Sequence, residues 1–178
     1  LDTLLASFLE PGSVSWLYYS DRLNNLPLGI FAIAIGVVIL PALSKKHAEN
    51  DSAHFALTLD WATRMIFLLA LPAALALVVL ATPLMATIFF HGEITPYDIG
   101  KMTLSLQAYG IGLFAFMLIK VLAPGYYARQ DTKTPVKIGI QAMAVNMVLN
   151  LALVGPFQHA GLALATSLSA FFNAYMLY

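Results

Sequence analysis

Long apolar runs without charged side chains divide this sequence. Five of them are long enough to cross a lipid bilayer, which takes about 20 helical residues. They cover residues 23–44, 65–90, 102–123 (with Lys120 near its end), 138–156 and 160–178. Residues 1–9 are a shorter apolar stretch that we interpret as part of a sixth span. No run alternates as a barrel strand does, and backbone groups in lipid must bond within their own segment. The pattern therefore predicts an all-α, multi-pass membrane protein.

The composition supports a membrane protein. Of the 178 residues, 60% are hydrophobic and 10% are charged, and the mean hydropathy is +0.81. A soluble domain has about 25% charged residues. The net charge of zero gives no support for nucleic-acid binding, and the absence of cysteine excludes disulfides and thiolate metal sites. The sequence begins with Leu1 and ends at Tyr178 inside an apolar run, so we expect an internal piece of a longer protein.

The basic residues predict the orientation in the membrane. With five full spans, one side of the membrane holds Lys45, Lys46, Arg64, Arg129, Lys133 and Lys137, and the other holds Arg22 and Lys101. Cytoplasmic loops carry the excess of lysine and arginine. The first set is therefore predicted to be cytoplasmic, and Arg22 and the loop at 91–101 are predicted to lie toward the outer face.

Arg22 stands at the head of an uncharged run and has two interpretations. A helix over residues 13–43 would be about 45 Å long, against about 30 Å of hydrocarbon, so Arg22 could lie at the headgroup level beside an aromatic belt. Alternatively, it points into a water-filled cavity between helices, where its guanidinium suits a phosphate. Adjacent Asp21 does not share its helix face, whereas Asn25 does.

Other polar side chains inside the runs leave further alternatives. Lys120 either extends to the cytoplasmic interface or lines a cavity. Asn146 and Asn150 are four residues apart, so they lie on one helix face, and Thr166 follows in the next helix. These groups either form interhelical hydrogen bonds or offer oxygen ligands to a hard cation such as sodium, to which Asp2 would add a carboxylate.

The sequence gives little support for an enzyme. It contains no metal-ligand cluster, glycine-rich phosphate loop or nucleophile motif. The four histidines, His47, His54, His91 and His159, lie in or beside loops and are interpreted as solvated. An enzyme acting on a lipid-linked sugar would have only Glu93 and Asp98 as acids near the outer face. A non-transporting scaffold would tolerate the loss of Arg22 and Lys120.

Two long stretches carry a resemblance to a known family. "GSVSWLYYSDRLNNLPLGIFAIAIGVVILPALSK" (12–45) and "KVLAPGYYARQDTKTPVKI" (120–138) resemble the MurJ (MviN) family of lipid II flippases, and residues 56–95 fit as well. The resemblance implies the second lobe of a MATE-like transporter of the MOP superfamily, from the end of helix 7 through helix 12. No bond is made or broken in this function. The expected cargo is undecaprenyl-diphosphate-linked disaccharide-pentapeptide, moved by alternating access to the periplasmic leaflet of the bacterial inner membrane. Membrane lipids and the cell-wall synthesis machinery are the expected partners.

The resemblance also implies site residues. Arg22 matches the arginine of the family's "DR" motif, and with Asp21, Asn25 and Lys120 it is expected to bind the cargo. A sodium site of some members matches Asp2, Asn146, Asn150 and Thr166. Some members have an aspartate at the position of Asn150. Because this chain lacks that negative charge, the membrane potential is the alternative to sodium as the driving force for transport. The runner-up function is a related exporter, either a polysaccharide-lipid flippase or a multidrug antiporter, although the residues of 65–90 and 138–178 include no carboxylate for an antiporter.

Overall fold

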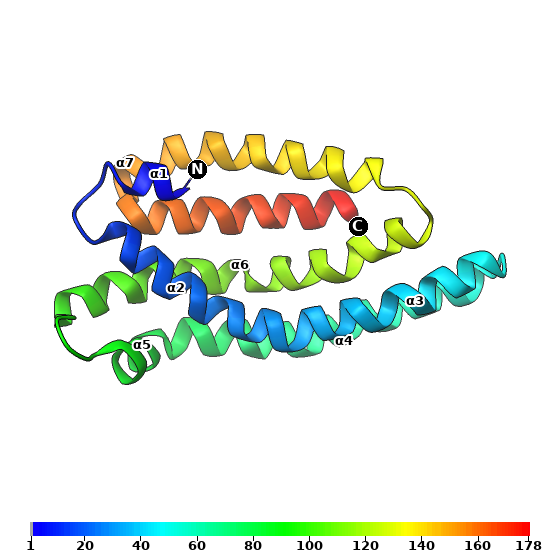
Figure 1. The fold of residues 1–178 in the computed structure, drawn as a ribbon, viewed down its shortest axis with the longest axis horizontal. Coiled ribbons are helices and arrows are strands. Elements are labelled where there is room, and N and C mark those ends of the chain that lie inside the picture. Colours follow the sequence, from blue (N-terminus) through cyan, green and yellow to red (C-terminus); the bar gives the residue numbers. More distant parts are fainter. Residues whose placement is uncertain (1) are drawn as a thin grey trace.

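The computed structural model describes residues 2–178 and contains only helices, turns and loops in that part of the chain. The elements are α1 (Asp2–Ala6), α2 (Ser13–Pro27), the π-helical segment η1 (Leu28–Ile33), α3 (Ala34–Ala48), α4 (Ser52–Val79), α5 (Ala81–Phe89), α6 (Pro96–Ala128) and α7 (Lys133–Leu177). The long helices run side by side along the longest axis of the molecule (Figure 1). The predicted all-helical fold is confirmed. Leu1, from the predicted partial span 1–9, lies outside the described residues.

The segments α2, η1 and α3 form one continuous helical rod of 36 residues from Ser13 to Ala48. The rod contains the apolar run 23–44 and extends beyond it at both ends. Pro27 ends α2 and the wider π-helical turns of η1 follow at once. Proline has no backbone N–H, so it removes one bond of the helical ladder and favours such a local change of winding.

The uncharged run 65–90 covers parts of two helices. α4 ends at Val79, Leu80 leaves the helical conformation with φ −94° and ψ 13°, and α5 begins at Ala81. Pro83 explains the position of this break: its ring cannot donate to the carbonyl of Val79 and would clash with it in a continuous helix.

α7 is a hairpin of two antiparallel arms, 133–157 and 159–177. Gln158 has φ 50° and ψ −130°, which turns the chain back on itself. Asn146 in the first arm bonds to Thr166 in the second at 3.3 Å, whereas 20 residues of straight helix would separate them by about 30 Å. Gly161 lies at the tight end of the hairpin, where an added Cβ would overlap the Leu153 carbonyl oxygen. Figure 1 shows the two arms lying side by side.

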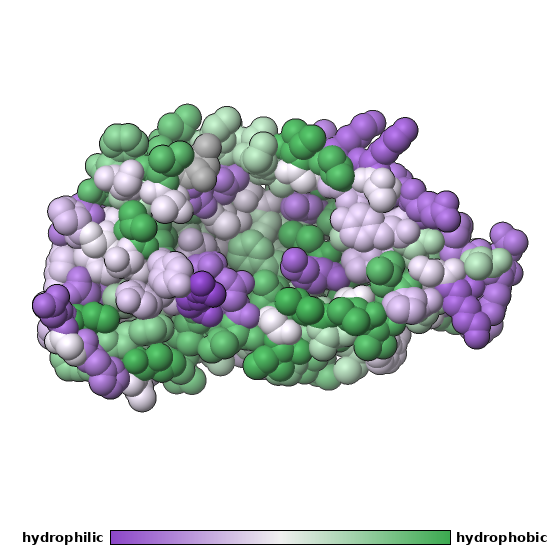
Figure 2. All heavy atoms as spheres, in the orientation of Figure 1, coloured by the Kyte–Doolittle hydropathy of each residue, from purple (hydrophilic) through white to green (hydrophobic). Residues whose placement is uncertain are grey.

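α6 is the central helix of the bundle. In its most apolar 18-residue window 61% of residues are buried, against 17% to 22% in the other three helices that are long and apolar enough to cross a membrane. It packs so closely on the second arm of α7 that a Cβ on Gly112 would lie 2.6 Å from the Ser167 Cβ. Hydrophobic side chains cover much of the outer surface visible in Figure 2, as expected of helices that face lipid.

Candidate functional site

A partly buried polar cluster joins α1 to both arms of α7. Asn150 Nδ2 donates to Asp2 Oδ1 at 2.7 Å and to Asn146 Oδ1 at 3.0 Å. The Thr166 hydroxyl lies 2.8 Å from Asp2 Oδ2 and 3.0 Å from the Leu162 carbonyl oxygen, and its single proton can bond to only one of them. Asn146 Nδ2 donates to the Thr166 oxygen at 3.3 Å. The structure thus brings together the four residues that the sequence singled out as oxygen ligands.

One atom of this cluster lacks a partner. Asn150 is fully buried, and its Oδ1 makes no hydrogen bond with any described residue. A buried polar atom without a partner is costly, so the site favours a donor or a cation at this oxygen. The available ligands are carboxylate, amide and hydroxyl oxygens, which suit a hard cation. No group of three or more His, Cys, Asp or Glu residues lies together in the described chain, and Asp2 supplies the carboxylate of this cluster.

A second polar surface lies on α2. Asn25 Nδ2 donates to Asp21 Oδ2 at 2.8 Å, one helical turn away. The Arg22 guanidinium carbon lies 4.9 Å from the centre of the Tyr18 ring, and no described carboxylate forms an ion pair with it. Arg22 is exposed. Figure 2 shows a group of hydrophilic side chains where α2 runs in Figure 1, on a face that mixes hydrophobic and hydrophilic patches. The result is an unpaired cation on a polar helix face.

Lys120 lies at a different depth from Arg22. Ser20 on α2 donates to the Met102 carbonyl oxygen at 2.9 Å, whereas Lys120 is 18 residues further along α6, or about 27 Å. There the Lys120 carbonyl packs against Gly36 of α3, and the residue is exposed. The structure therefore does not bring Lys120 and Arg22 into one site.

A cluster of aromatic and polar residues that the sequence did not predict lies near the predicted outer end. Trp16 Nε1 donates to Asp98 Oδ1 at 2.8 Å, and the ring centre of His159 lies 5.1 Å from that of Trp16, edge to face. His159 is only 2% exposed, and its Nε2 is 3.2 Å from the Lys101 carbonyl oxygen. The prediction that His159 is a solvated loop residue is therefore wrong, because the α7 reversal packs it beneath α2.

Charged groups extend this cluster to the segment between α1 and α2. Tyr97 Oη donates to the Glu10 carboxylate at 3.0 Å, and Lys101 Nζ lies 3.5 Å from Glu10 Oε2. Asp98 also accepts hydrogen bonds from the backbone and side chain of Thr95 in a capping box at the start of α6. Asp98 was one of the two acids that an enzyme acting on a lipid-linked sugar would have near the outer face. Its carboxylate instead accepts hydrogen bonds that connect α2 to α6 and cap α6.

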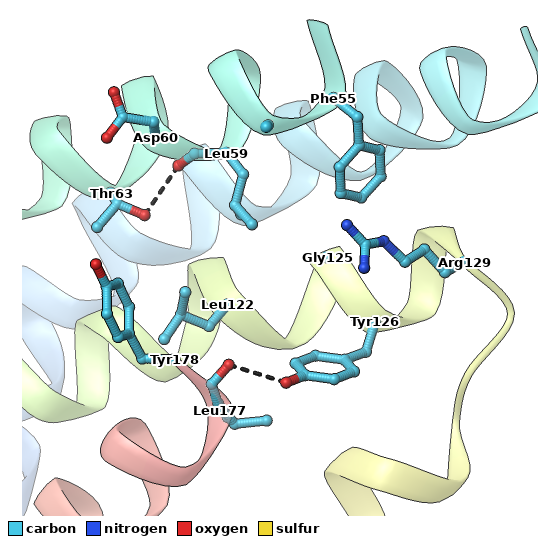
Figure 3. Close-up of a pocket in the computed structure, with 11 residues that line it drawn as sticks. Phe55, Leu59, Asp60, Thr63, Leu122, Gly125, Tyr126, Arg129, Leu177 and Tyr178 are labelled. Atoms are coloured by element: carbon cyan, nitrogen blue, oxygen red, sulfur yellow. Dashed lines mark hydrogen bonds between the residues drawn. The ribbon is translucent and has the colours of Figure 1, made fainter. Parts of the chain in front are cut away.

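A cavity of about 340 Å³ lies between α4, α6 and the end of α7 (Figure 3). The Arg129 guanidinium carbon lies 4.4 Å from the centre of the Phe55 ring, and Tyr126 Oη donates to the Leu177 carbonyl oxygen at 3.1 Å. The sequence indicated Arg129 only as one of several cytoplasmic cations. The lining is mixed, because Asp60, Thr63 and Arg129 lie among apolar side chains such as Leu59 and Leu122.

Comparison with solved structures defines the class of protein. Across 99% of this chain, a multidrug MATE-family transporter of the MOP superfamily superposes with a TM-score of 0.82 at 17% identity, the match covering 39% of that chain. A lipid II flippase MurJ in an inward closed conformation superposes with a TM-score of 0.91 at 29% identity, covering 99% of this chain and 37% of the other. The helical bundle therefore has the fold of the corresponding part of these two membrane transporters.

Sequence comparison then identifies the family. The family model for lipid II flippase MurJ matches residues 1–178. A probable lipid II flippase MurJ from Vibrio cholerae is 57% identical over 177 residues, and a lipid II flippase MurJ from Burkholderia cenocepacia is 44% identical over 178 residues. These matches cover 99% and 100% of this chain and 34% of each relative. The chain belongs to the MurJ family, and it spans about a third of the length of these relatives.

Proposed function

We propose that this chain is most of the second lobe of a flippase for lipid II. The cargo is undecaprenyl-diphosphate-linked disaccharide-pentapeptide, carried from the cytoplasmic to the periplasmic leaflet of the bacterial inner membrane. Family membership over the full chain and the close fit to a MurJ structure support this proposal. Two MATE structures share the fold at 16% and 17% identity, which supports a common architecture and no more.

The unpaired guanidinium of Arg22 is the observation that carries the proposal. A diphosphate that leaves water loses hydration worth many kcal/mol unless it meets a counter-charge. Arg22 can supply that charge because no described carboxylate forms an ion pair with it. Two parallel N–H donors of the guanidinium match a phosphate. Lys120, further along α6, would contact the anion at a separate point on its path.

The Asp2 cluster fits a coupling cation. Asp2, Thr166 and the unpartnered Oδ1 of Asn150 would hold a sodium ion, with the Asn146 amide as a neighbour. A bound ion would supply positive charge that neutralises Asp2 between α1 and the two arms of α7. Filling this site would favour one packing of these three segments and so couple ion binding to the alternation of the lobes.

The proposal is tested by complementation in the full-length parent protein. Arg22→Ala should fail to rescue a bacterium depleted of its own lipid II flippase, whereas Arg22→Lys should rescue in part because it keeps the charge without the planar fork. Arg64→Ala is the matched control, since Arg64 is 79% exposed and paired with Asp60 at 2.8 Å. Full rescue by Arg22→Ala at normal membrane abundance would contradict the proposal.

A further inference from the structure

A second, smaller cavity of about 290 Å³ adjoins the Asp2 cluster between α1, α2, α6 and α7. Its polar lining includes Asp2 and Thr166, which belong to the cluster, and Asp21, Tyr18 and Tyr109, which do not. Asp2 and Thr166 therefore form a wall shared by the cavity and the cluster. Since water takes up about 30 Å³ in the liquid, the space can hold several molecules.

The charge of this cavity is negative. Asp2 and Asp21 both line it, and no lysine, arginine or histidine is among the described residues that do. Arg22 is not among the lining residues, although it neighbours Asp21 and its guanidinium carbon lies 4.9 Å from the centre of the Tyr18 ring. Asn25 occupies only one oxygen of Asp21, Oδ2, so the other remains available. Two carboxylates and no basic group attract a cation and repel the diphosphate of the cargo.

Tyr109 gives independent evidence for a polar occupant. Its side chain is 7% exposed, it lines this cavity, and its hydroxyl makes no hydrogen bond with a described residue. The Tyr109 hydroxyl is not among the fully buried polar atoms that lack a partner, so it is open to the cavity that its side chain lines. A partner can therefore come from the cavity itself, as water or as an ion with its hydration shell.

We propose that this cavity is the entry vestibule through which a hydrated monovalent cation, with Na⁺ as the representative, reaches the Asp2 cluster. Asp21 provides the attracting charge and Tyr109 an oxygen ligand for the ion or its water. Asp21 thus serves the cation rather than the lipid cargo, and it supplies the second negative charge that Asn150 does not. This inference rests on the proposed cation site.

Sodium binding to the full-length parent in detergent tests the vestibule. The readout is the Na⁺ concentration that gives half of the sodium-dependent rise in the thermal midpoint, with choline chloride holding the ionic strength constant. Asp2→Asn should abolish the rise. Asp21→Asn should increase the half-saturating concentration roughly three- to tenfold, as expected for removing one charge near the ion. Asp60→Asn, which removes an exposed carboxylate paired with Arg64, should leave it unchanged.

The outcomes separate the two proposals. Suppose that Asp2→Asn abolishes the sodium-dependent rise, but Asp21→Asn has the same half-saturating Na⁺ concentration as Asp60→Asn. The vestibule proposal is then wrong, and the proposed cation site is retained. If wild type shows no sodium-specific rise, both are wrong. If Asp21→Asn does not fold, Tyr109→Phe is the second test, because it removes only a hydroxyl. A half-saturating Na⁺ concentration equal to that of wild type would contradict the vestibule proposal.

Discussion

Asn150 Nδ2 donates a 2.7 Å hydrogen bond to Asp2 Oδ1, joining residues 148 positions apart. This contact ties α1 to the first arm of α7 and orients the Asn150 amide with its oxygen buried and unpartnered. The same bond that gives the cluster its geometry therefore leaves an oxygen ready for a cation.

Replacing Asn150 with Asp should make the protein more dependent on sodium. The variant loses the amide donor and places two carboxylates side by side, which we expect to cost about 1–3 kcal/mol without sodium. With sodium bound, the second charge is compensated. Thermal unfolding of the full-length parent should show a lower midpoint in choline chloride and a larger rise in sodium chloride than wild type. An equal response to sodium in both proteins would contradict the cation site.

Trp16 should contribute strongly to stability through its bond to Asp98. It is 3% exposed, and Trp16→Phe removes the 2.8 Å hydrogen bond and part of the contact with His159. We expect a loss of about 1–3 kcal/mol. Trp61→Phe is the matched control, because Trp61 is 55% exposed, and it should change stability by less than about 0.5 kcal/mol. Similar thermal midpoints for the two variants would show that the Trp16 bond contributes nothing.

Gly112 should not tolerate a methyl group. Gly112→Ala places Cβ against the backbone and side chain of Ser167, and relieving such overpacking costs about 1–3 kcal/mol. Gly100→Ala lies on the same helix with no atom within 4 Å of the added Cβ. It should be neutral or stabilising, since alanine favours the helix over glycine by about 0.5–1 kcal/mol. Thermal unfolding of both variants checks this, and a Gly112→Ala protein as stable as Gly100→Ala would rule out the close packing of α6 on α7.

Asp131 should stabilise the start of α7 only above acidic pH. A hydrogen bond from the Thr134 hydroxyl, with another from its backbone N–H, holds the pKa of the Asp131 carboxyl below its ordinary 3.8. A lowered folded-state pKa means that the stabilisation is complete above the unfolded-state pKa and is lost as the pH falls through the folded-state pKa. The difference in thermal midpoint between wild type and Asp131→Ala should therefore be constant from about pH 7 to pH 5 and shrink below about pH 4. A difference that grew on acidification would contradict this.

Local patterns in the sequence predicted a chain made of long helices, as the structure has it. The gap between the apolar runs 138–156 and 160–178 contains Gln158, where α7 reverses. The i, i+4 spacing of Asn146 and Asn150 was enough to place both amides on one face. The sequence could therefore place residues whose position is set by spacing within a single helix.

Contacts between distant segments were not accessible in the same way. The burial of His159 depends on Trp16, and the capture of Asp98 by Trp16 spans 82 residues. No local periodicity encodes such pairings. The break at Leu80 could have been expected from Pro83, but an apolar run gives no reason to choose between a kinked helix and two separate ones.

The most direct test of the central claim, that Arg22 holds the anionic cargo, is the accessibility of lipid II at the outer leaflet. Spheroplasts depleted of their own flippase would carry the full-length parent as wild type, Arg22→Ala, Arg22→Lys or the Arg64→Ala control, at matched membrane levels. We predict loss of outer-leaflet lipid II for Arg22→Ala, partial retention for Arg22→Lys and wild-type levels for Arg64→Ala. Wild-type accessibility in Arg22→Ala would show that the arginine lies at the lipid headgroups and takes no part in carrying the cargo.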